Sequence, residues 1–314
     1  VWPGRPRLAF VAATVARLAP GHLFLLSSVN NDPLAEALTS VALLAAVRLS
    51  LATPSRTCWL LWVLGGVAAV STKLSAAPAL AGASLALLFH YRNAIDRILG
   101  RRLTMVLAGS AAIAIVAADA TLLARHPSTS RLASIAHFWP LALIRAPLVY
   151  VREGFRESFR TFWYAYDYAV RFPRPLEAIL AGVALSLCIV ALLGLLWGAS
   201  RAAGCGPVRR LPLIVWGAAV VQLVLVVGRL GFADVLAIDM GGAAQAKAFF
   251  PALLPLALLT TAGLAEAVPR LVRRSAGGSD RQLALITLTT FLALDWASLA
   301  VTLWHHYRWW QVGA

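Results

Sequence analysis

Charged side chains are scarce in this sequence, and acidic ones are the scarcest. Only 13% of the 314 residues are charged, whereas 60% are hydrophobic. A soluble globular domain carries about 25% charged residues, so this composition argues against a soluble fold. Several apolar runs reach the ~20 residues that a membrane-crossing helix needs. We therefore expect an all-α fold, a polytopic bundle of transmembrane helices.

Cysteine is almost absent as well. The three cysteines, Cys58, Cys188 and Cys205, have no metal-binding spacing such as C-x-x-C and imply no disulfide framework. No signal peptide is recognisable either. Because the chain begins with Val1 instead of Met, we expect further residues upstream.

Basic residues outnumber acidic ones 28 to 13, which gives a net charge of +15. A nucleic-acid-binding protein would gather such charge on one face. Here the arginines are scattered through short loops between apolar runs, so we expect a lipid bilayer as partner and no nucleic acid. Short basic loops stay in the cytoplasm. Threading the spans alternately then places residues 26–36, 124–175 and 228–248 on the outer side.

Seven apolar runs are predicted as full spans: 8–26, 34–51, 103–123, 176–197, 211–227, 249–268 and 283–303. Residues 58–90 are too long for one ordinary span and short for two, so we expect a hairpin of short helices that breaks at Ser71-Thr72-Lys73. There is no internal repeat and no low-complexity linker. We therefore expect a single transmembrane domain over residues 1–314, with an external section at 124–175.

A short polar seam, residues 26–36, lies between the first two spans. Asp32 fits a helix N-cap, and Pro33 fits the first helical position, where a missing N–H costs nothing. Asp32 and Glu36 then share one face of the helix that follows, with Asn31 just before them. The pattern predicts either a capped helix start alone or an acidic site at the outer membrane surface.

Lys73 is the only charged residue between Cys58 and His90. A lysine inside a bilayer costs about 2.5–3.5 kcal/mol on insertion scales. We therefore expect it either to snorkel from a helix end or to meet an anion such as a phosphate. In the second case the Thr72 hydroxyl and free backbone N–H groups at the helix break would bind the same anion.

The external section carries aromatic residues at helical spacing with arginines between them, from Phe155 to Val170. This pattern predicts a basic amphipathic helix in the headgroup layer. Its role is to anchor the section, or else Arg160 and Tyr166 bind a lipid-linked or polyhydroxylated substrate. Lys247, alone at the entrance to a later span, is expected either to anchor its helix or to meet a phosphate.

The order of these motifs resembles the GT-C class of membrane glycosyltransferases, which includes the protein O-mannosyltransferase, aminoarabinose-transferase and arabinosyltransferase groups. The likeness covers roughly residues 8–268 and rests on Ser28-Val29-Asn30-Asn31-Asp32, Ser71-Thr72-Lys73-Leu74-Ser75, Phe162-Trp163 and Lys247-Ala248-Phe249-Phe250-Pro251. The last segment stands where such chains often read Gly-Arg-Tyr-Leu-Phe-Pro. Lys247 keeps the charge of that arginine but not its bidentate pairing.

The resemblance implies transfer of a sugar from a polyprenyl-phosphate donor to a lipid, glycan or protein acceptor, at the outer face of a bacterial plasma membrane. Such a transfer needs a carboxylate, as base or as ligand of a divalent cation such as Mg²⁺ or Mn²⁺. It also needs cations that stabilise the departing phosphate. The predicted catalytic residues are Asp32 and Glu36. The predicted substrate-binding residues are Asn31, Thr72, Lys73, Lys247, Arg160 and Tyr166.

Two other classes of function remain open at this point. In a transporter or lipid flippase, Lys73, Asp295 and the broken hairpin would line a path through the membrane. The chain would otherwise be a non-catalytic membrane subunit. An acidic pair after an additional span upstream of Val1 would favour the transferase, because the GT-C class carries an acidic residue in its first external loop.

Overall fold

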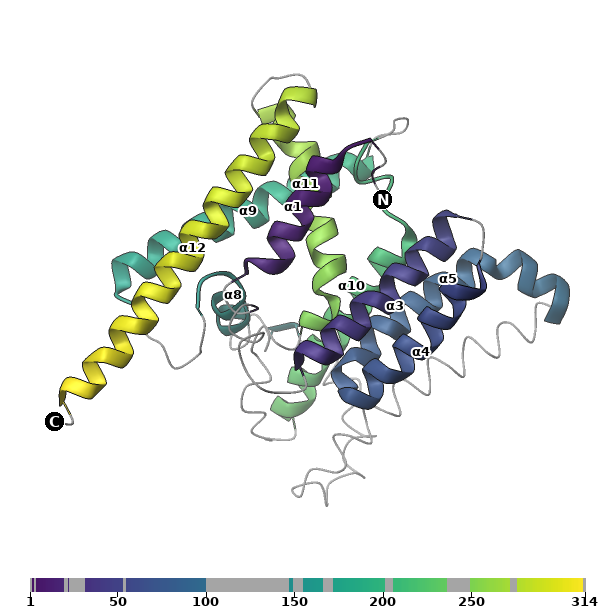
Figure 1. The fold of residues 1–314 in the computed structure, drawn as a ribbon, viewed down its shortest axis with the longest axis horizontal. Coiled ribbons are helices and arrows are strands. Elements are labelled where there is room, and N and C mark those ends of the chain that lie inside the picture. The colour runs from purple at the N-terminus through teal and green to yellow at the C-terminus, as the bar shows by residue number, and fades with distance from the viewer. Residues whose placement is uncertain are drawn as a thin grey trace, which may run out of the picture. The chain divides into compact units, whose positions relative to one another are not determined.

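The computed structural model describes residues 2, 4–19, 22, 32–52, 55–99, 147–148, 155–165, 172–200, 206–235, 249–271 and 276–312. Every regular element in this part of the chain is a helix (Figure 1), as the composition predicts. The α-helices are α1 (Pro6–Arg17), α3 (Asp32–Leu51), α4 (Arg56–Thr72), α5 (Ala77–Leu99), α8 (Phe155–Trp163), α9 (Arg174–Ser200), α10 (Leu213–Val235), α11 (Leu253–Leu271) and α12 (Ala276–Val312). Two short 3-10 helices, η1 (Leu74–Ala76) and η4 (Phe250–Ala252), precede α5 and α11.

Within the described ranges, five helical segments are long and apolar enough to cross a membrane. They cover Asp32–Leu51, Leu74–Arg92, Arg174–Ser200, Phe250–Leu271 and Asp280–Trp304. Several spanning helices of this kind are consistent with a membrane protein. Four of the segments correspond to predicted full spans, at 34–51, 176–197, 249–268 and 283–303.

The remaining predicted spans are not confirmed. The predicted span 211–227 is helical, but its apolar part is shorter than the five above. Of the predicted span 8–26, the structure describes α1 and little beyond it, and the predicted span 103–123 lies outside the described residues.

The predicted hairpin at 58–90 is not confirmed either, although its break is where we expect it. Helix α4 ends at Thr72, and Lys73 is extended, with φ −156° and ψ 120°. The segment that follows, Leu74–Arg92, is by itself long enough to cross a membrane. The region is therefore a shorter apolar helix joined to a candidate span, rather than a pair of short helices.

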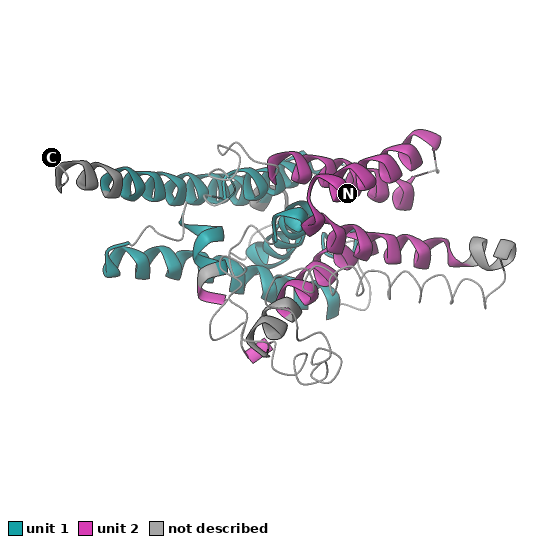
Figure 2. Cartoon of the chain, turned by 90° about the horizontal axis from the view of Figure 1, so that it is seen from below, with its two compact units in different colours: residues 1–30, 157–212, 245–314 teal, residues 31–156, 213–244 magenta. Residues whose placement is uncertain are grey.

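The contacts divide the chain into two compact units, each made of segments that are distant in sequence (Figure 2). Unit 1 consists of residues 1–30, 157–212 and 245–314, and unit 2 consists of residues 31–156 and 213–244. Because both units are discontinuous, the division does not cut the chain into two sequence domains. One domain over 1–314 stays a prediction.

Unit 2 is built on two helix pairs, α3 with α4 and α5 with α10. The second pair is held at very short range by two glycines. A Cβ atom at Gly217 would lie 2.6 Å from the Gly82 carbonyl oxygen, and a Cβ at Gly82 would clash with the Gly217 carbonyl. Close backbone approach through small residues is the usual way in which helices associate in lipid, where no hydrophobic force drives them together.

Unit 1 uses the same device between α9 and α11. A Cβ atom at Gly194 would clash with the Gly263 carbonyl, and one at Gly263 would clash with the Ala191 carbonyl. Helix α1 packs against both α11 and α12. Its buried side chains, among them Leu8, Val11 and Val15, lie on one face.

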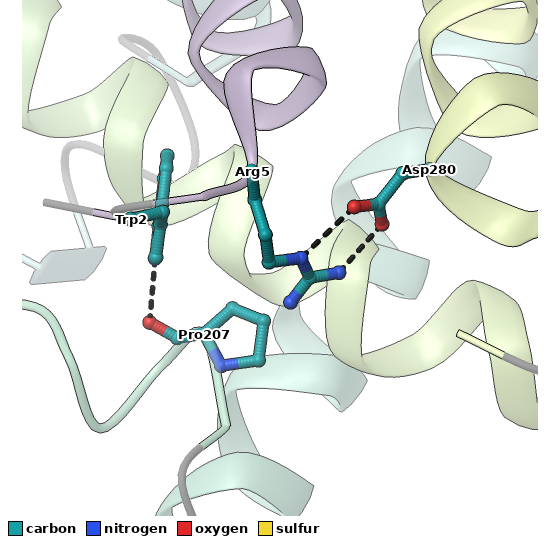
Figure 3. A network of polar contacts seen from close by, with 4 residues as sticks. All are labelled: Trp2, Arg5, Pro207 and Asp280. Carbon is teal, nitrogen blue, oxygen red and sulfur yellow. Dashed lines mark hydrogen bonds and ion pairs between the residues drawn. The ribbon is translucent and has the colours of Figure 1, made fainter. Parts of the chain in front are cut away.

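The segment before α1 ties unit 1 together with polar contacts (Figure 3). The Trp2 indole N–H donates to the Pro207 carbonyl at 3.0 Å, and the Arg5 guanidinium donates to both Asp280 oxygens, at 2.9 and 2.5 Å. The alternate threading of spans puts these three segments on one side of the membrane, and that topology stays a prediction.

Candidate functional site

Residues 32–36 of the seam form the start of α3. The helix begins at Asp32, with Pro33 in its first turn, where a residue without an N–H loses no hydrogen bond. Helix termini assigned by different criteria differ by a residue or two, so this start agrees with the predicted one. Glu36 follows one turn later on the same face and is 9% exposed. Asp32 thus marks the end of a candidate span, and Glu36 is enclosed by protein.

Lys73 lies at the break between α4 and η1, within the apolar run from Cys58 to His90. Its N–H donates to the Ala69 carbonyl at 2.9 Å and closes α4, after which its own carbonyl accepts from the Ala76 N–H of η1 at 3.1 Å. The Thr72 hydroxyl donates to the Ala68 carbonyl at 2.8 Å. Thr72 therefore uses its hydroxyl proton within α4, and its role toward an anion stays a prediction.

Asp32 and Lys73 form an ion pair within unit 2. The Lys73 side chain is 34% exposed and that of Asp32 is 14% exposed. A lysine in an apolar helix pair is expensive unless it is paired or reaches water, and Asp32 supplies the pairing. The structure thus brings together one predicted catalytic carboxylate and one predicted phosphate-binding cation.

Gln222 is a further polar residue of this site that our reading of the sequence missed. It lies on α10, is 1% exposed, and its Nε2 donates to the Ser75 carbonyl in η1 at 3.4 Å. The only signal in the sequence is a single amide inside the apolar run Val221-Gln222-Leu223. Polar groups in such runs face other helices, and this one reaches the turn directly after Lys73.

The close contact between α5 and α10 explains why Gln222 reaches that turn. Gly82 and Gly217 fix the distance between the two helices. Ser75 lies about two helical turns before Gly82, and Gln222 lies about one and a half turns after Gly217. A larger residue at either glycine would separate the backbones. The sequence of small residues therefore positions the amide, and the amide holds the turn that carries Lys73.

The site so defined consists of Asp32 and Glu36 from α3, Lys73 from the helix break and Gln222 from α10. It combines two acidic groups, one primary ammonium and one amide, within apolar surroundings where charge interactions are stronger than in water. A carboxylate in such a place can accept a proton, and the ammonium can stabilise an oxyanion. We call this group of four residues the α3–α10 polar site.

Arg160 belongs to unit 1 and lies on α8, within the predicted amphipathic stretch. Two aromatic side chains of α8 pack against other helices of unit 1, and a headgroup-facing role of the section stays a prediction. The ring centroids of Trp163 and Phe291 of α12 lie 5.5 Å apart in a tilted arrangement, and those of Phe162 and Phe250 of η4 lie 6.2 Å apart. Arg160 itself is 6% exposed. A nine-residue amphipathic pattern does not distinguish a lipid surface from a protein surface, because both bury the apolar side.

Three predicted site residues, Asn31, Tyr166 and Lys247, lie outside the described residues. Among the residues that are described, no group of three His, Cys, Asp or Glu side chains could hold a metal ion. The divalent cation stays a prediction, for which Asp32 and Glu36 are the two acidic groups of the α3–α10 polar site.

Comparison with known proteins adds no relative to this picture. No family model matches the chain, and neither a curated protein nor a solved structure is similar to it. The GT-C resemblance therefore rests on the motifs in the sequence alone.

Proposed function

We propose that the protein is a membrane glycosyltransferase that moves a sugar from a polyprenyl-phosphate donor to a hydroxyl acceptor. The observation that carries this proposal is the Asp32–Lys73 ion pair. The pair brings a carboxylate and an ammonium group together at the end of a candidate span. Glycosyl transfer from a lipid phosphate needs both of these groups.

The two charges neutralise one another while no donor is bound. A donor phosphate competes with Asp32 for the Lys73 ammonium, which leaves the Asp32 carboxylate free to accept a proton. The acceptor hydroxyl then gives its proton to Asp32 as its oxygen bonds to the anomeric carbon. The bond from that carbon to the phosphate oxygen breaks at the same time, and Lys73 stabilises the negative charge of the departing polyprenyl phosphate.

Glu36 and Gln222 support this pair in different ways. Glu36 adds a second carboxyl group one turn from Asp32, where it takes a share of a divalent cation if the reaction uses one. Gln222 binds the carbonyl of Ser75 and so holds the Lys73 turn in place. Neither residue needs to touch the reacting atoms for these roles.

The test is transfer from radiolabelled polyprenyl-phosphate sugars by the purified full chain in vesicles, with a panel of sugars. We expect Asp32→Asn and Lys73→Met to lower the rate at least about 100-fold, as removal of a general base does. The control is the double variant Arg5→Gln/Asp280→Asn, which removes an ion pair of unit 1. Wild-type rates in a combined Asp32→Asn/Lys73→Met variant would contradict the assignment.

A transporter is the second candidate, and the helix break at Lys73 favours it. Broken helices with a charge at the break often line substrate paths in transporters. The same vesicles separate the two functions. A transporter moves labelled lipid or sugar across the bilayer and leaves it chemically unchanged, whereas the transferase releases polyprenyl phosphate and a glycosylated product.

A further inference from the structure

Three exposed arginines lie around the end of unit 2 at which α3 finishes and α4 begins. Arg48 is in the last turn of α3, Arg56 is the first residue of α4, and Arg92 is on α5. The side chains of all three are exposed. We call Arg48, Arg56 and Arg92 the arginine patch.

Tyr91 of α5 brings the three helices together at this place. Its hydroxyl donates to the Leu49 carbonyl of α3 at 2.5 Å, and its ring centroid lies 5.8 Å from that of Trp59 of α4. Each member of the arginine patch is next in sequence to one of these three residues or one helical turn away from it. The contacts of Tyr91 therefore gather the patch at one end of the three helices.

The arginine patch has a surplus of positive charge. None of its members is ion-paired with another residue of the described ranges, and Arg92 lies over the ring of Phe89, with its guanidinium carbon 4.3 Å from the ring centroid. The sequence from 37 to 102 holds six arginines and one acidic residue, Asp96. Asp96 can neutralise one of these charges at most. Like charges held close together repel one another, and a bound anion would remove that repulsion.

Two aromatic side chains give the depth of the arginine patch in a membrane. Trp and Tyr are enriched where headgroups meet hydrocarbon, and Trp59 and Tyr91 form the aromatic contact next to the patch. The candidate span of α3 ends at Leu51, and the candidate span that contains α5 ends at Arg92 itself. In a bilayer the arginine patch therefore lies at the level of the lipid phosphates.

An apolar face of α4 continues from the patch toward the hydrocarbon. Leu60, Val63 and Leu64 follow Trp59 on this helix and are all exposed, and no residue from 57 to 70 is charged. A lipid with an anionic headgroup matches both parts, because its head meets the arginines and its chains meet α4. A soluble anion would match the arginines alone, and a zwitterionic lipid carries an ammonium group that the arginines repel.

We propose that the arginine patch binds the headgroup phosphate of an anionic phospholipid, whose acyl chains lie along the exposed face of α4. Guanidinium groups donate pairs of hydrogen bonds to phosphate oxygens, and basic pockets between membrane helices bind anionic headgroups in this way. Asp32 begins α3, whereas the patch is at the other end of that helix. The proposal therefore goes beyond the proposed function and does not depend on it.

The experiment measures which lipids stay on the purified full chain. The protein is reconstituted with equal amounts of phosphatidylethanolamine and phosphatidylglycerol and extracted in a mild detergent, and native mass spectrometry counts the bound lipids. We expect phosphatidylglycerol to be retained several-fold over phosphatidylethanolamine. The triple variant Arg48→Gln/Arg56→Gln/Arg92→Gln should lose this preference. Equal retention of the two lipids by the wild-type chain would overturn the proposal.

The matched control removes the same amount of charge from unit 1. Arg7, Arg210 and Arg281 are exposed as well, and Arg7→Gln/Arg210→Gln/Arg281→Gln should keep the wild-type preference. Thermal unfolding of both triple variants in the same detergent shows whether each is folded. Equal loss of the preference in two folded triple variants would assign the retention to net charge alone and contradict a site at the arginine patch.

Two measurements on the wild-type chain separate a lipid from a soluble anion. Phosphatidylglycerol with a photoreactive acyl chain should give adducts on residues 59–67 of α4 after illumination. Glycerol phosphate, which has the phosphate without the chains, should not displace this lipid at the same concentration. Displacement by glycerol phosphate together with the absence of adducts on α4 would assign the patch to a soluble anion and contradict the proposal.

Discussion

Asp32, in the first turn of α3, is ion-paired with Lys73, the residue at which α4 ends. The pair joins the seam between the first two predicted spans to the helix break within the apolar run 58–90. Each partner lowers the free-energy cost of placing the other charge in apolar surroundings, where an isolated charge is strongly unfavourable.

Removing one partner of the pair should destabilise unit 2 more than removing both. We expect Asp32→Asn or Lys73→Met alone to cost about 1–2 kcal/mol, since the side chains retain partial access to solvent. The double variant should recover part of that loss, although it stays inactive. Thermal unfolding of all four proteins in the same detergent gives the coupling energy. Strictly additive losses would show that the two groups do not interact.

The contact between Gly82 and Gly217 should be sensitive to any added side chain. We expect Gly82→Leu to destabilise the protein by about 1–3 kcal/mol or more, because overpacking pushes α5 away from α10. Gly66→Ala is the matched control, since a Cβ there meets only the Leu80 Cδ1 atom, at 3.9 Å. The midpoint of thermal unfolding reports the difference. Equal midpoints for the two variants would contradict the close packing.

Gln222 should act as a positioning residue. We expect Gln222→Leu to lower kcat of the proposed transfer by up to tenfold and to leave KM nearly unchanged, which corresponds to the loss of one hydrogen bond of about 0.5–1.5 kcal/mol. Gln222→Glu should not restore the rate, because a carboxylate cannot donate to the Ser75 carbonyl. Gln222→His, which keeps a donor, should restore part of it. A purely structural role would instead lower the folded fraction of Gln222→Leu and leave kcat per folded molecule unchanged.

The orientation of the chain can be checked with single cysteines in a background without Cys58, Cys188 and Cys205. By the positive-inside rule, we expect a cysteine at Ser28 to react with a membrane-impermeant maleimide added outside intact cells. A cysteine at Gly277, near the basic residues that follow α11, should react only after the membrane is opened. The reverse pattern would invert the proposed topology and place the α3–α10 polar site inside.

Hydropathy was sufficient to predict the all-helical fold and several of the spanning segments, because a long apolar run has few alternatives to a helix in lipid. It also located the break at Lys73 and the helix start at Asp32, which are local features with local causes. Hydropathy does not predict tertiary contacts. Nothing in the sequence around Gly82 names Gly217 as its partner, and for that reason Gln222 was missed.

The prediction for α8 shows a different limit. Its aromatic spacing correctly indicated an amphipathic helix, but the same pattern suits a headgroup layer and a protein surface. The contacts of Trp163 with Phe291 and of Phe162 with Phe250 join this end of α8 to unit 1, and the spacing alone does not predict them. Arg160 consequently moves from a predicted surface cation to a buried one.

The hydrogen bonds from Trp2 to Pro207 and from Arg5 to Asp280 have a consequence for biosynthesis. Arg5 and Asp280 are 275 residues apart, and α1 packs on α11 and α12. During translation α1 therefore leaves the ribosome long before its partners exist, and it must wait in the insertion machinery or in lipid until α11 and α12 have been made. A chain that stops before α12 would leave α1 without its native contacts and exposed to quality-control proteolysis.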